Sequence, residues 1–470
     1  MTYQEEINLA LDKIYSKTFK AAFQKKTEEK TDLEKRLMLE CYVTTDCNQT
    51  CSYCYLCKHG NELYPLEYRK PEVILKNFRI FMDYLMENKM FYPERFDFFS
   101  GEIWGMELGN SLLEITYEYI LKGFHPTKII IPSNFSFILD DKMIETLDIF
   151  IKNYKEQGVV LAFSCSNDGL YNDVMTRPFN HSEEDAELKK GTAPYYDKLF
   201  TYCKERGFGF HPMVSAHGIK YWKENFKWWQ EQMRKYDIDP MSSIMFLEVR
   251  NDDWTDEAIE HYLKYLNYHI EYYWKNYFKS PTTSTNQLYK DWIHCRSGYN
   301  SAGLYQPATL PRDKFTPGCT ISRSLVVRLG DLSIVPCHRT SYDEFIFGKY
   351  LLNEERTKIE SIQAKNTTFM NQVWLNNYTG VSKCNCCPYN RYCLKGCFGS
   401  QFEATGDILY PCETVCDLYK ARILFLYAKY SQKELLDLDG EDKEFAILID
   451  KVKETKEYEK WMPIIQSIIS

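Results

Sequence analysis

The sequence predicts an α/β fold, in which a parallel sheet is covered by helices and is followed by a cysteine-rich region. Two observations support this prediction. Short apolar runs alternate with longer amphipathic segments through the first half of the chain, which is the pattern of repeated strand–helix units. Cysteines then gather in the second half. The alternation favours parallel strands, because each helix returns the chain to the same end of the sheet.

Six apolar runs are predicted strands, and amphipathic segments between them are predicted helices. The strands are 37–43, 95–99, 128–132, 159–166, 209–214 and 243–249. The helices are 72–88, 111–122, 142–157 and 195–206. Six repeats are fewer than the eight of a closed TIM barrel. The residues directly after each strand are the first candidates for a functional site, since chemistry gathers at the carboxyl ends of such strands.

Composition limits the function classes. At 470 residues the chain has room for two or three domains. The net charge of −8 argues against nonspecific nucleic-acid binding, and no run of about 18 apolar residues predicts a membrane span. The first residues, MTYQEEINLALDKIY, are not a secretory signal. We therefore expect a cytoplasmic protein whose 17 cysteines are metal ligands or free thiols.

Three cysteines directly follow the first predicted strand. Cys47, Cys51 and Cys54 have the spacing C-x3-C-x2-C, and the aromatic residue Tyr53 precedes the third. A [4Fe–4S] cluster normally takes four thiolates, so a loop with three leaves one iron open to another ligand. The alternatives are ordinary cysteines or part of a zinc site.

This motif resembles the signature of the radical S-adenosylmethionine (SAM) enzymes. The resemblance implies an open six-stranded (β/α)6 partial TIM barrel. It also implies that the open iron binds the amino and carboxylate groups of SAM. Reductive cleavage would then give methionine and a 5′-deoxyadenosyl radical.

Polar residues at the predicted strand ends extend the resemblance. Ser100-Gly101-Glu102 is similar to the family's G-G-E segment, which holds the SAM amino group, although Ser100 and Ile103 depart from it. Taken singly, each such residue is also compatible with a turn or a helix cap. An insertion at 181–188 separates Arg177 from the next helix. The residues that the resemblance assigns to cofactor binding are Tyr53, Ser100, Gly101, Glu102, Ser133, Asn134, Ser164, Ser166 and Arg177.

A second cysteine group resembles the SPASM extension, whose seven cysteines bind two auxiliary [4Fe–4S] clusters, in a domain of short β-hairpins and helices. Its core is the C-x2-C-x5-C-x3-C run of Cys384, Cys387, Cys393 and Cys397. A zinc ribbon is the main alternative. The family pattern assigns Cys384, Cys387 and Cys393 to one cluster, with Cys416 as fourth ligand and Cys412 as its alternative.

The other auxiliary cluster would use Cys319, Cys337 and Cys397. Asp313 stands where the family has a cysteine, so the fourth ligand would be Cys295, further upstream, through a longer loop, or the position would be open to substrate. The predicted domains are an N-terminal helical extension (1–36), the radical SAM barrel (37–255), a helical bridge (256–294), the SPASM domain (295–425) and a C-terminal helical tail (426–470).

The resemblance implies hydrogen abstraction from a peptide or protein, giving a thioether, a carbon–carbon crosslink, an epimer or an oxidised side chain. Candidate catalytic residues are His338, Glu248 and Arg177. His338 stands where anaerobic sulfatase maturases have an aspartate, which argues against formylglycine formation. The alternatives are a small-molecule radical SAM dehydrogenase, a sulfatase-maturase-like enzyme, an iron–sulfur electron carrier and a zinc protein.

The expected partners follow from the same resemblance. They are a peptide or protein substrate and an electron donor of the flavodoxin or ferredoxin type. Only about 36 residues precede the first strand, and a fused leader-peptide-binding domain needs about twice that. Leader recognition, where it occurs, would lie elsewhere in the chain or on a separate protein. No nucleic acid and no membrane is expected.

Overall fold

The computed structural model describes residues 38–178, 193–238, 247–277, 321, 324–379, 382–390, 393, 396–436 and 443–470. It divides into two compact units, which we describe separately. The first unit comprises 1–166, 179–208 and 321–374, and the second comprises 167–178, 209–320 and 375–470. The predicted N-terminal extension, Cys295 and Cys319 lie outside the described residues.

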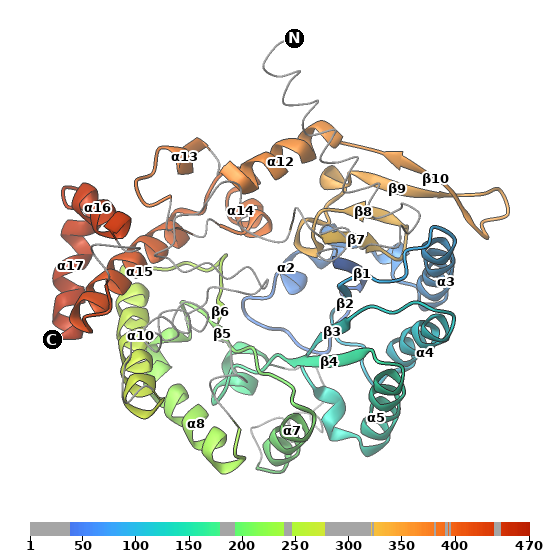
Figure 1. Ribbon diagram of the computed structural model, residues 1–470, viewed down its shortest axis with the longest axis horizontal. Helices are drawn as coiled ribbons and strands as arrows, with labels where there is room; N and C mark the ends of the chain where they lie inside the picture. The colour runs from blue at the N-terminus through green and yellow to red at the C-terminus, as the bar shows by residue number, and fades with distance from the viewer. Residues whose placement is uncertain are drawn as a thin grey trace, which may run out of the picture. The chain divides into compact units, whose positions relative to one another are not determined.

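The first unit is built on an eight-stranded sheet with the order β10-β9-β8-β7-β1-β2-β3-β4. Four of its strands are parallel neighbours: β1 (Met38–Thr44), β2 (Arg95–Ser100), β3 (Lys128–Ser133) and β4 (Val160–Cys165). In Figure 1 the helices that follow these strands line the outer side of the sheet. These helices are α3 (Pro71–Glu87), α4 (Glu107–Leu121), α5 (Asp141–Glu156) and α7 (Ala193–Arg206).

Local sequence explains why these elements form. The middle of β1 is buried at Cys41, Tyr42 and Val43, as expected for a strand covered on both faces. In α3 the buried residues recur at helical spacing, and Pro71 occupies the first turn, where its missing N–H costs no hydrogen bond. The carboxylate of Asp140 caps α5 by accepting hydrogen bonds from two backbone amides of the first turn.

Strands overlap the predicted ranges as far as the described residues extend, but they belong to two sheets. The short strands β5 (Met213–Val214) and β6 (Leu247–Glu248) pair in parallel with each other in a separate ladder of the second unit. The prediction of one six-stranded sheet therefore differs from the structure. Strand β5 begins later than predicted, directly after Pro212, which has no amide to donate to a ladder.

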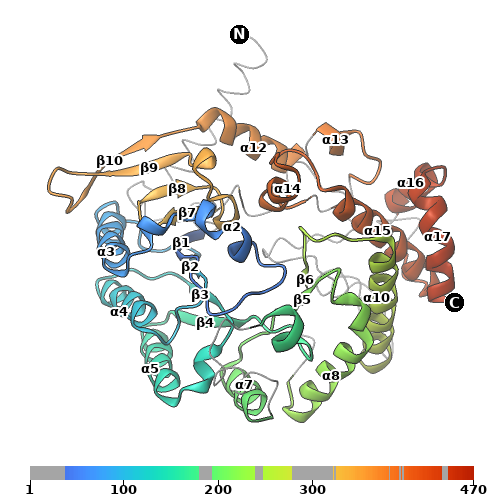
Figure 2. The same cartoon turned by 180° about the vertical axis from the view of Figure 1, so that it is seen from behind.

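The antiparallel strands of the second half extend the first sheet. They are β7 (Ser324–Arg328), β8 (Ser333–Val335), β9 (Gly348–Leu352) and β10 (Ile359–Ala364). Strand β7 pairs in parallel with β1, from Met38 opposite Ser324 onward, and the remaining strands continue as hairpins beside it (Figure 2). These hairpins are joined to the sheet of β1.

Helices make up most of the described part of the second unit. They include α8 (Trp222–Lys235), α10 (Asp256–Tyr277), α13 (Ser382–Asn385), α14 (Phe398–Thr405), α15 (Glu413–Gln432), α16 (Lys443–Val452) and α17 (Lys456–Ile469). Helix α15 is buried on nearly all sides and packs against α10, α16 and α17. Other helical segments among the described residues are α2 (Tyr55–Leu63), η2 (Leu66–Tyr68), η3 (Ser136–Leu139), η4 (Asn172–Thr176), η5 (Ile219–Tyr221), η7 (His338–Thr340), η8 (Asp343–Phe345) and α12 (Thr367–Thr379). Among the described helices, none is both long and apolar enough to cross a bilayer.

A buried carboxyl group in β2 makes the stability of the first unit depend on pH. Burial raises the pKa of Asp97 to about 6, although Arg95 and the amide of Ile130 oppose this shift. Because the pKa of Asp97 is higher in the folded state than the unfolded value near 4, the carboxyl group contributes its full stabilisation below pH 4. This stabilisation is lost as the pH rises through 6. We expect the free energy of unfolding of the wild type to fall by about 3 kcal/mol relative to Asp97→Asn between pH 4 and 7. Parallel urea titrations at both pH values would measure this, and equal pH dependence in the two proteins would contradict it.

Candidate functional site

The three cysteines of the C-x3-C-x2-C motif lie in the loop between β1 and α2. The start of this loop is fastened to the end of β2, because the amide of Gly101 donates to the Thr44 carbonyl at 3.0 Å and that of Glu102 donates to the Asp46 carbonyl at 2.9 Å. A Cβ atom on Gly101 would stand 1.8 Å from the Asp46 carbonyl oxygen. Only glycine therefore allows this approach of the two backbones.

The three thiols of this loop lie close enough to interact electrostatically. Burial, Glu102, Cys51 and Cys54 together raise the pKa of Cys47 to about 12, and a hydrogen bond from the Gln49 amide opposes the shift. The backbone amide of Cys54 donates a hydrogen bond to the Cys51 carbonyl and so closes a turn, and Cys54 is the N-cap of α2. The Cys47 thiol is therefore protonated in the unloaded protein at neutral pH, and metal binding there would have to release its proton.

Cys57 lies against the same group. Its thiol donates to the Gln49 carbonyl at 3.6 Å, and a hydrogen bond with Cys54 raises its pKa. Three of the cysteines that have no assigned ligand role, Cys41, Cys165 and Cys203, are buried.

Three residues that the sequence assigns to cofactor binding form one hydrogen-bonded group beside the cysteine loop. Glu102 is 4% exposed, and its carboxylate accepts from the Ser133 hydroxyl at 3.0 and 3.1 Å and from the Asn134 amide at 2.5 Å. The side chain of Asn134 donates to Asn48 in the cysteine loop at 2.7 Å. This group joins the ends of β2 and β3 to the loop.

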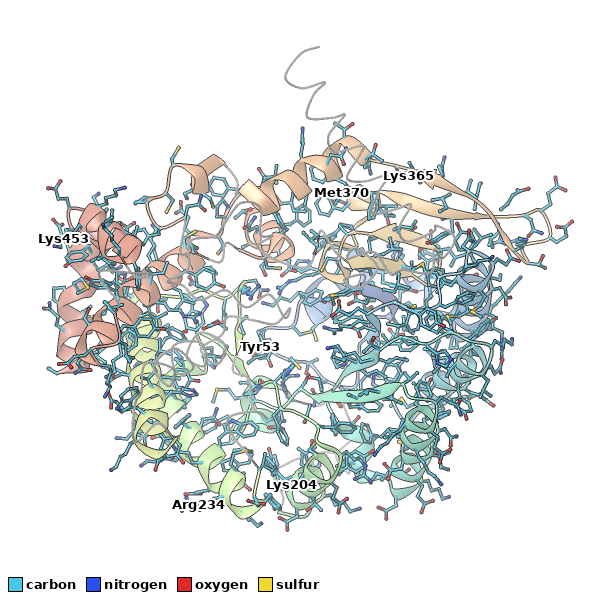
Figure 3. The ribbon with its side chains drawn as sticks, in the orientation of Figure 1. Tyr53, Lys204, Arg234, Lys365, Met370 and Lys453 are labelled. Carbon is cyan, nitrogen blue, oxygen red and sulfur yellow. The ribbon has the colours of Figure 1, made fainter. Side chains whose placement is uncertain are left out.

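The remaining predicted contacts of the first unit lie at the same strand ends. Ser100 and Ser164 are buried, and the amide of Ser166 donates to the Ser133 carbonyl at 2.8 Å. Tyr53 belongs to the loop that carries the three cysteines (Figure 3). The sequence thus located the carboxyl ends of β2, β3 and β4 correctly, and it missed Asn48 as the residue that connects them to the loop.

His338 packs against the end of β2. Its ring stacks on Phe99 with ring centroids 3.7 Å apart and an interplanar angle of 6°. Its Nδ1 lies 2.7 Å from Oε1 of Glu40 in β1, and the ring centroid of Tyr55 in α2 lies 6.3 Å away at an interplanar angle of 25°. The sequence did not predict a role for Glu40, although a charged residue within a buried strand was a signal.

Arg177 lies in the second unit, where it forms a buried ion pair. Its Nε lies 3.0 Å from Oδ1 of Asp168, and the same oxygen accepts from the amide of Met213 in β5 at 2.9 Å. Asp168 and Thr176 line a cavity of about 530 Å³ with residues of η5, α8 and α10. The predicted insertion at 181–188 lies outside the described residues.

Glu248 is the predicted catalytic candidate of β6. It is 4% exposed, its Oε1 accepts from the Tyr262 hydroxyl, and that oxygen lies 3.3 Å from Nη1 of Arg422. Arg422 itself is 1% exposed. The carboxylate is thus held by a cation and a hydroxyl inside the second unit.

Five cysteines of the second unit line one cavity of about 330 Å³. They are Cys384, Cys393, Cys397, Cys412 and Cys416. Burial, with smaller contributions from the nearby Cys393 and Cys384, raises the pKa of Cys416 to about 12. The cavity is also lined by Arg250, Ser400 and Tyr419, which the sequence interpretation did not single out.

Two groups of cysteines, those of the C-x3-C-x2-C loop and those that line the cavity of the second unit, fit iron–sulfur chemistry. Each group offers several thiols as ligands. The backbone amide of Cys387 donates a hydrogen bond to the Cys384 carbonyl and so closes a turn. Cys337 follows β8 in the first unit. Over the described ranges, no three histidines, cysteines or carboxylates are placed to hold a single metal ion.

Comparisons with known proteins give similar structures only. No protein-family description and no curated protein matches the sequence. Native anSMEcpe with bound AdoMet has a TM-score of 0.52 at 15% identity, over 85% of this chain and 99% of its own. Native anSMEcpe with AdoMet and the Cp18Cys peptide has a TM-score of 0.50 at 15% identity, over 85% and 98%. Streptococcus suis SuiB bound to S-adenosylmethionine has a TM-score of 0.40 at 16% identity, over 86% and 78%. The likeness to anSMEcpe shows a shared fold.

Proposed function

We propose that this protein is a radical SAM enzyme with auxiliary iron–sulfur clusters that modifies a peptide or protein. The observation that carries the proposal is that Cys47, Cys51 and Cys54 share one loop, interact electrostatically with one another and lie beside the buried Glu102 group. The shared fold with anSMEcpe, whose structures contain AdoMet, supports it. When bound, a [4Fe–4S] cluster on these three thiols supplies the electron that cleaves SAM to methionine and a 5′-deoxyadenosyl radical.

The chain's own residues position SAM. Glu102 supplies a carboxylate for the cationic amino group, and Ser133 and Asn134 hold that carboxylate in place by hydrogen bonds. Tyr53 contacts the adenine. The close approach at Gly101 keeps the loop against β2. The other proposed contacts are Ser100, Ser164, Ser166 and Arg177.

The auxiliary clusters are assigned to the predicted SPASM domain. One is held by Cys384, Cys387, Cys393 and Cys416, and the shared cavity and mutual effects of three of these thiols support this set. Cys412 forms a contact of 3.4 Å with Thr414, which favours Cys416 as the ligand. The other cluster is held by Cys319, Cys337 and Cys397, with Cys295 or an open position as fourth ligand.

A peptide is the favoured substrate class because the fold is shared with anSMEcpe, which binds the Cp18Cys peptide. A flavodoxin or ferredoxin type protein would donate the electron. His338, Glu248 and Arg177 are the proposed catalytic residues. A small molecule is the alternative substrate.

Anaerobic reconstitution tests the proposal. Three clusters predict about 12 iron atoms per chain, and the dithionite-reduced protein should release 5′-deoxyadenosine from SAM, measured by liquid chromatography and mass spectrometry. Iron without SAM cleavage would instead identify an electron carrier. Stoichiometric zinc after purification would identify a zinc protein.

Glu102→Ala is expected to weaken SAM binding by roughly 1.5–3 kcal/mol, because it removes a charge-assisted hydrogen-bond acceptor. Anaerobic calorimetry on the reconstituted protein would measure the affinity. Glu118→Ala is the matched control, because Glu118 lies on α4 and forms an exposed ion pair with Arg79 of α3. Unchanged affinity in Glu102→Ala would mean that Glu102 only fastens β3 to β2.

His338→Gln tests a proton-accepting role. If the imidazole takes a proton from the substrate, product formation falls by about 10²- to 10⁴-fold while SAM cleavage persists. The assay uses peptides encoded beside the gene. Arg339→Gln controls for the neighbouring cation–π contact with Tyr55. A wild-type rate in His338→Gln would leave only the packing on Phe99 and the contact with Glu40.

A further inference from the structure

The cysteine-lined cavity of the second unit also contains two hydroxyl groups that have no hydrogen-bond partner among the described residues. Ser400 is 1% exposed and Tyr419 is 3% exposed. Within the described part of the chain, the Oγ of Ser400 and the hydroxyl oxygen of Tyr419 are buried and unpartnered, and both residues line the cavity of about 330 Å³. A buried donor that is left unpaired destabilises the folded protein by about 1–3 kcal/mol. A ligand in the cavity that accepts a hydrogen bond from each hydroxyl group would remove this cost.

The positions of the two hydroxyl groups follow those of the cysteines. Ser400 comes three residues after Cys397, the N-cap of α14, and Tyr419 comes three residues after Cys416 on α15. Residues three apart on a helix share a face. Each hydroxyl therefore lies on the same side of its helix as a thiol that lines the cavity.

The chemistry of the cavity suits an electron-rich occupant. A serine or tyrosine hydroxyl donates one hydrogen bond at neutral pH, and Arg250 adds a positive charge at the cavity wall. Thiolate and sulfide sulfur atoms accept such hydrogen bonds, and these bonds help to set the reduction potential of a cluster.

We propose that Ser400 and Tyr419 donate hydrogen bonds to the sulfur atoms of the auxiliary cluster in this cavity and raise its reduction potential. The inference rests on the cluster assigned above to Cys384, Cys387, Cys393 and Cys416. Reduction adds negative charge to the cluster, and a donor stabilises the more negative state more strongly. The two hydroxyl groups are positioning and tuning residues, and they are distinct from the ligands.

Ser400→Ala and Tyr419→Phe test the proposal, since each removes a hydroxyl and keeps nearly the same shape. The full-length protein is reconstituted anaerobically with Cys47, Cys51 and Cys54 replaced by alanine, so that only auxiliary clusters contribute to the electron paramagnetic resonance signal. Adding Cys384→Ala and Cys387→Ala to this protein identifies the signal of the auxiliary cluster in the cavity, because that signal should then disappear. We expect each hydroxyl deletion to lower the reduced-to-oxidised ratio about tenfold at a fixed ambient potential, which corresponds to about 59 mV for one electron.

Two further measurements separate tuning from a general structural effect. Exchangeable-proton couplings in electron–nuclear double resonance should weaken in each variant, and Ser400→Thr should restore both the coupling and the potential. Tyr427→Phe is the control, because Tyr427 lies on α15 and packs on Phe445. Wild-type potentials in both deletion variants, with the cluster present, would overturn this inference and leave the proposed function intact. A wild-type protein with no cluster in this cavity would overturn both.

Discussion

Replacing Cys47, Cys51 and Cys54 together by alanine is expected to abolish 5′-deoxyadenosine production and to remove about four iron atoms per chain. The loss should be complete, because these thiols are the only ligands assigned to the cluster that reduces SAM. Their side chains occupy a loop whose backbone is fixed by hydrogen bonds from Gly101 and Glu102, so the fold should survive. Iron analysis and chromatography of the SAM products measure both effects.

The matched variant for this experiment is Cys384→Ala with Cys387→Ala. It should also lose about four iron atoms, yet it should still cleave SAM, because the proposed radical-generating site lies wholly outside the cavity of the second unit. It should fail to convert the peptide if the auxiliary clusters carry electrons. SAM cleavage by the triple variant would refute the assignment of the first site. Parallel loss of every activity in the double variant would indicate that these cysteines serve folding.

The sequence was sufficient to locate the strands and helices that position the first site. The predicted strand 95–99 appears as β2, Arg95–Ser100, and the predicted helix 142–157 appears as α5, Asp141–Glu156. Such elements are predictable because their apolar residues recur at a regular local spacing. The strand ends, and with them Glu102 and Ser133, were therefore located as well.

Contacts between distant parts of the chain were not predictable. The pairing of β7 with β1 brings Ser324 opposite Met38, and no local pattern encodes a partner so far along the chain. The stacking of His338 on Phe99 depends on the same pairing, because β7 and β8 carry His338 to the sheet. The hydroxyl groups of Ser400 and Tyr419, which lack a partner among the described residues, could be identified only from the folded structure. Their three-residue spacing from the cysteines is common in sequences and does not distinguish them.

Arg422→Met is expected to lower the free energy of unfolding by about 3–5 kcal/mol. Arg422 and Glu248 are both buried, and Arg422 is the cation paired with this carboxylate at 3.3 Å. Methionine fills most of the volume of arginine but leaves the Glu248 charge with the Tyr262 hydroxyl and no paired cation. An unpaired charge in a protein interior costs more than the ion pair contributes. Urea unfolding at neutral pH would measure the difference.

Two further variants decide whether the effect comes from the unpaired charge. Adding Glu248→Gln to Arg422→Met should restore most of the stability, because both members of the pair are then neutral. Lys264→Met breaks a comparable pair with Glu260 that is largely exposed, and it should cost no more than about 0.5 kcal/mol. A loss below about 1 kcal/mol in Arg422→Met would contradict the buried pair. A stable double variant that still converts its substrate at the wild-type rate would also exclude Glu248 as a catalytic residue, because its carboxylate would be absent.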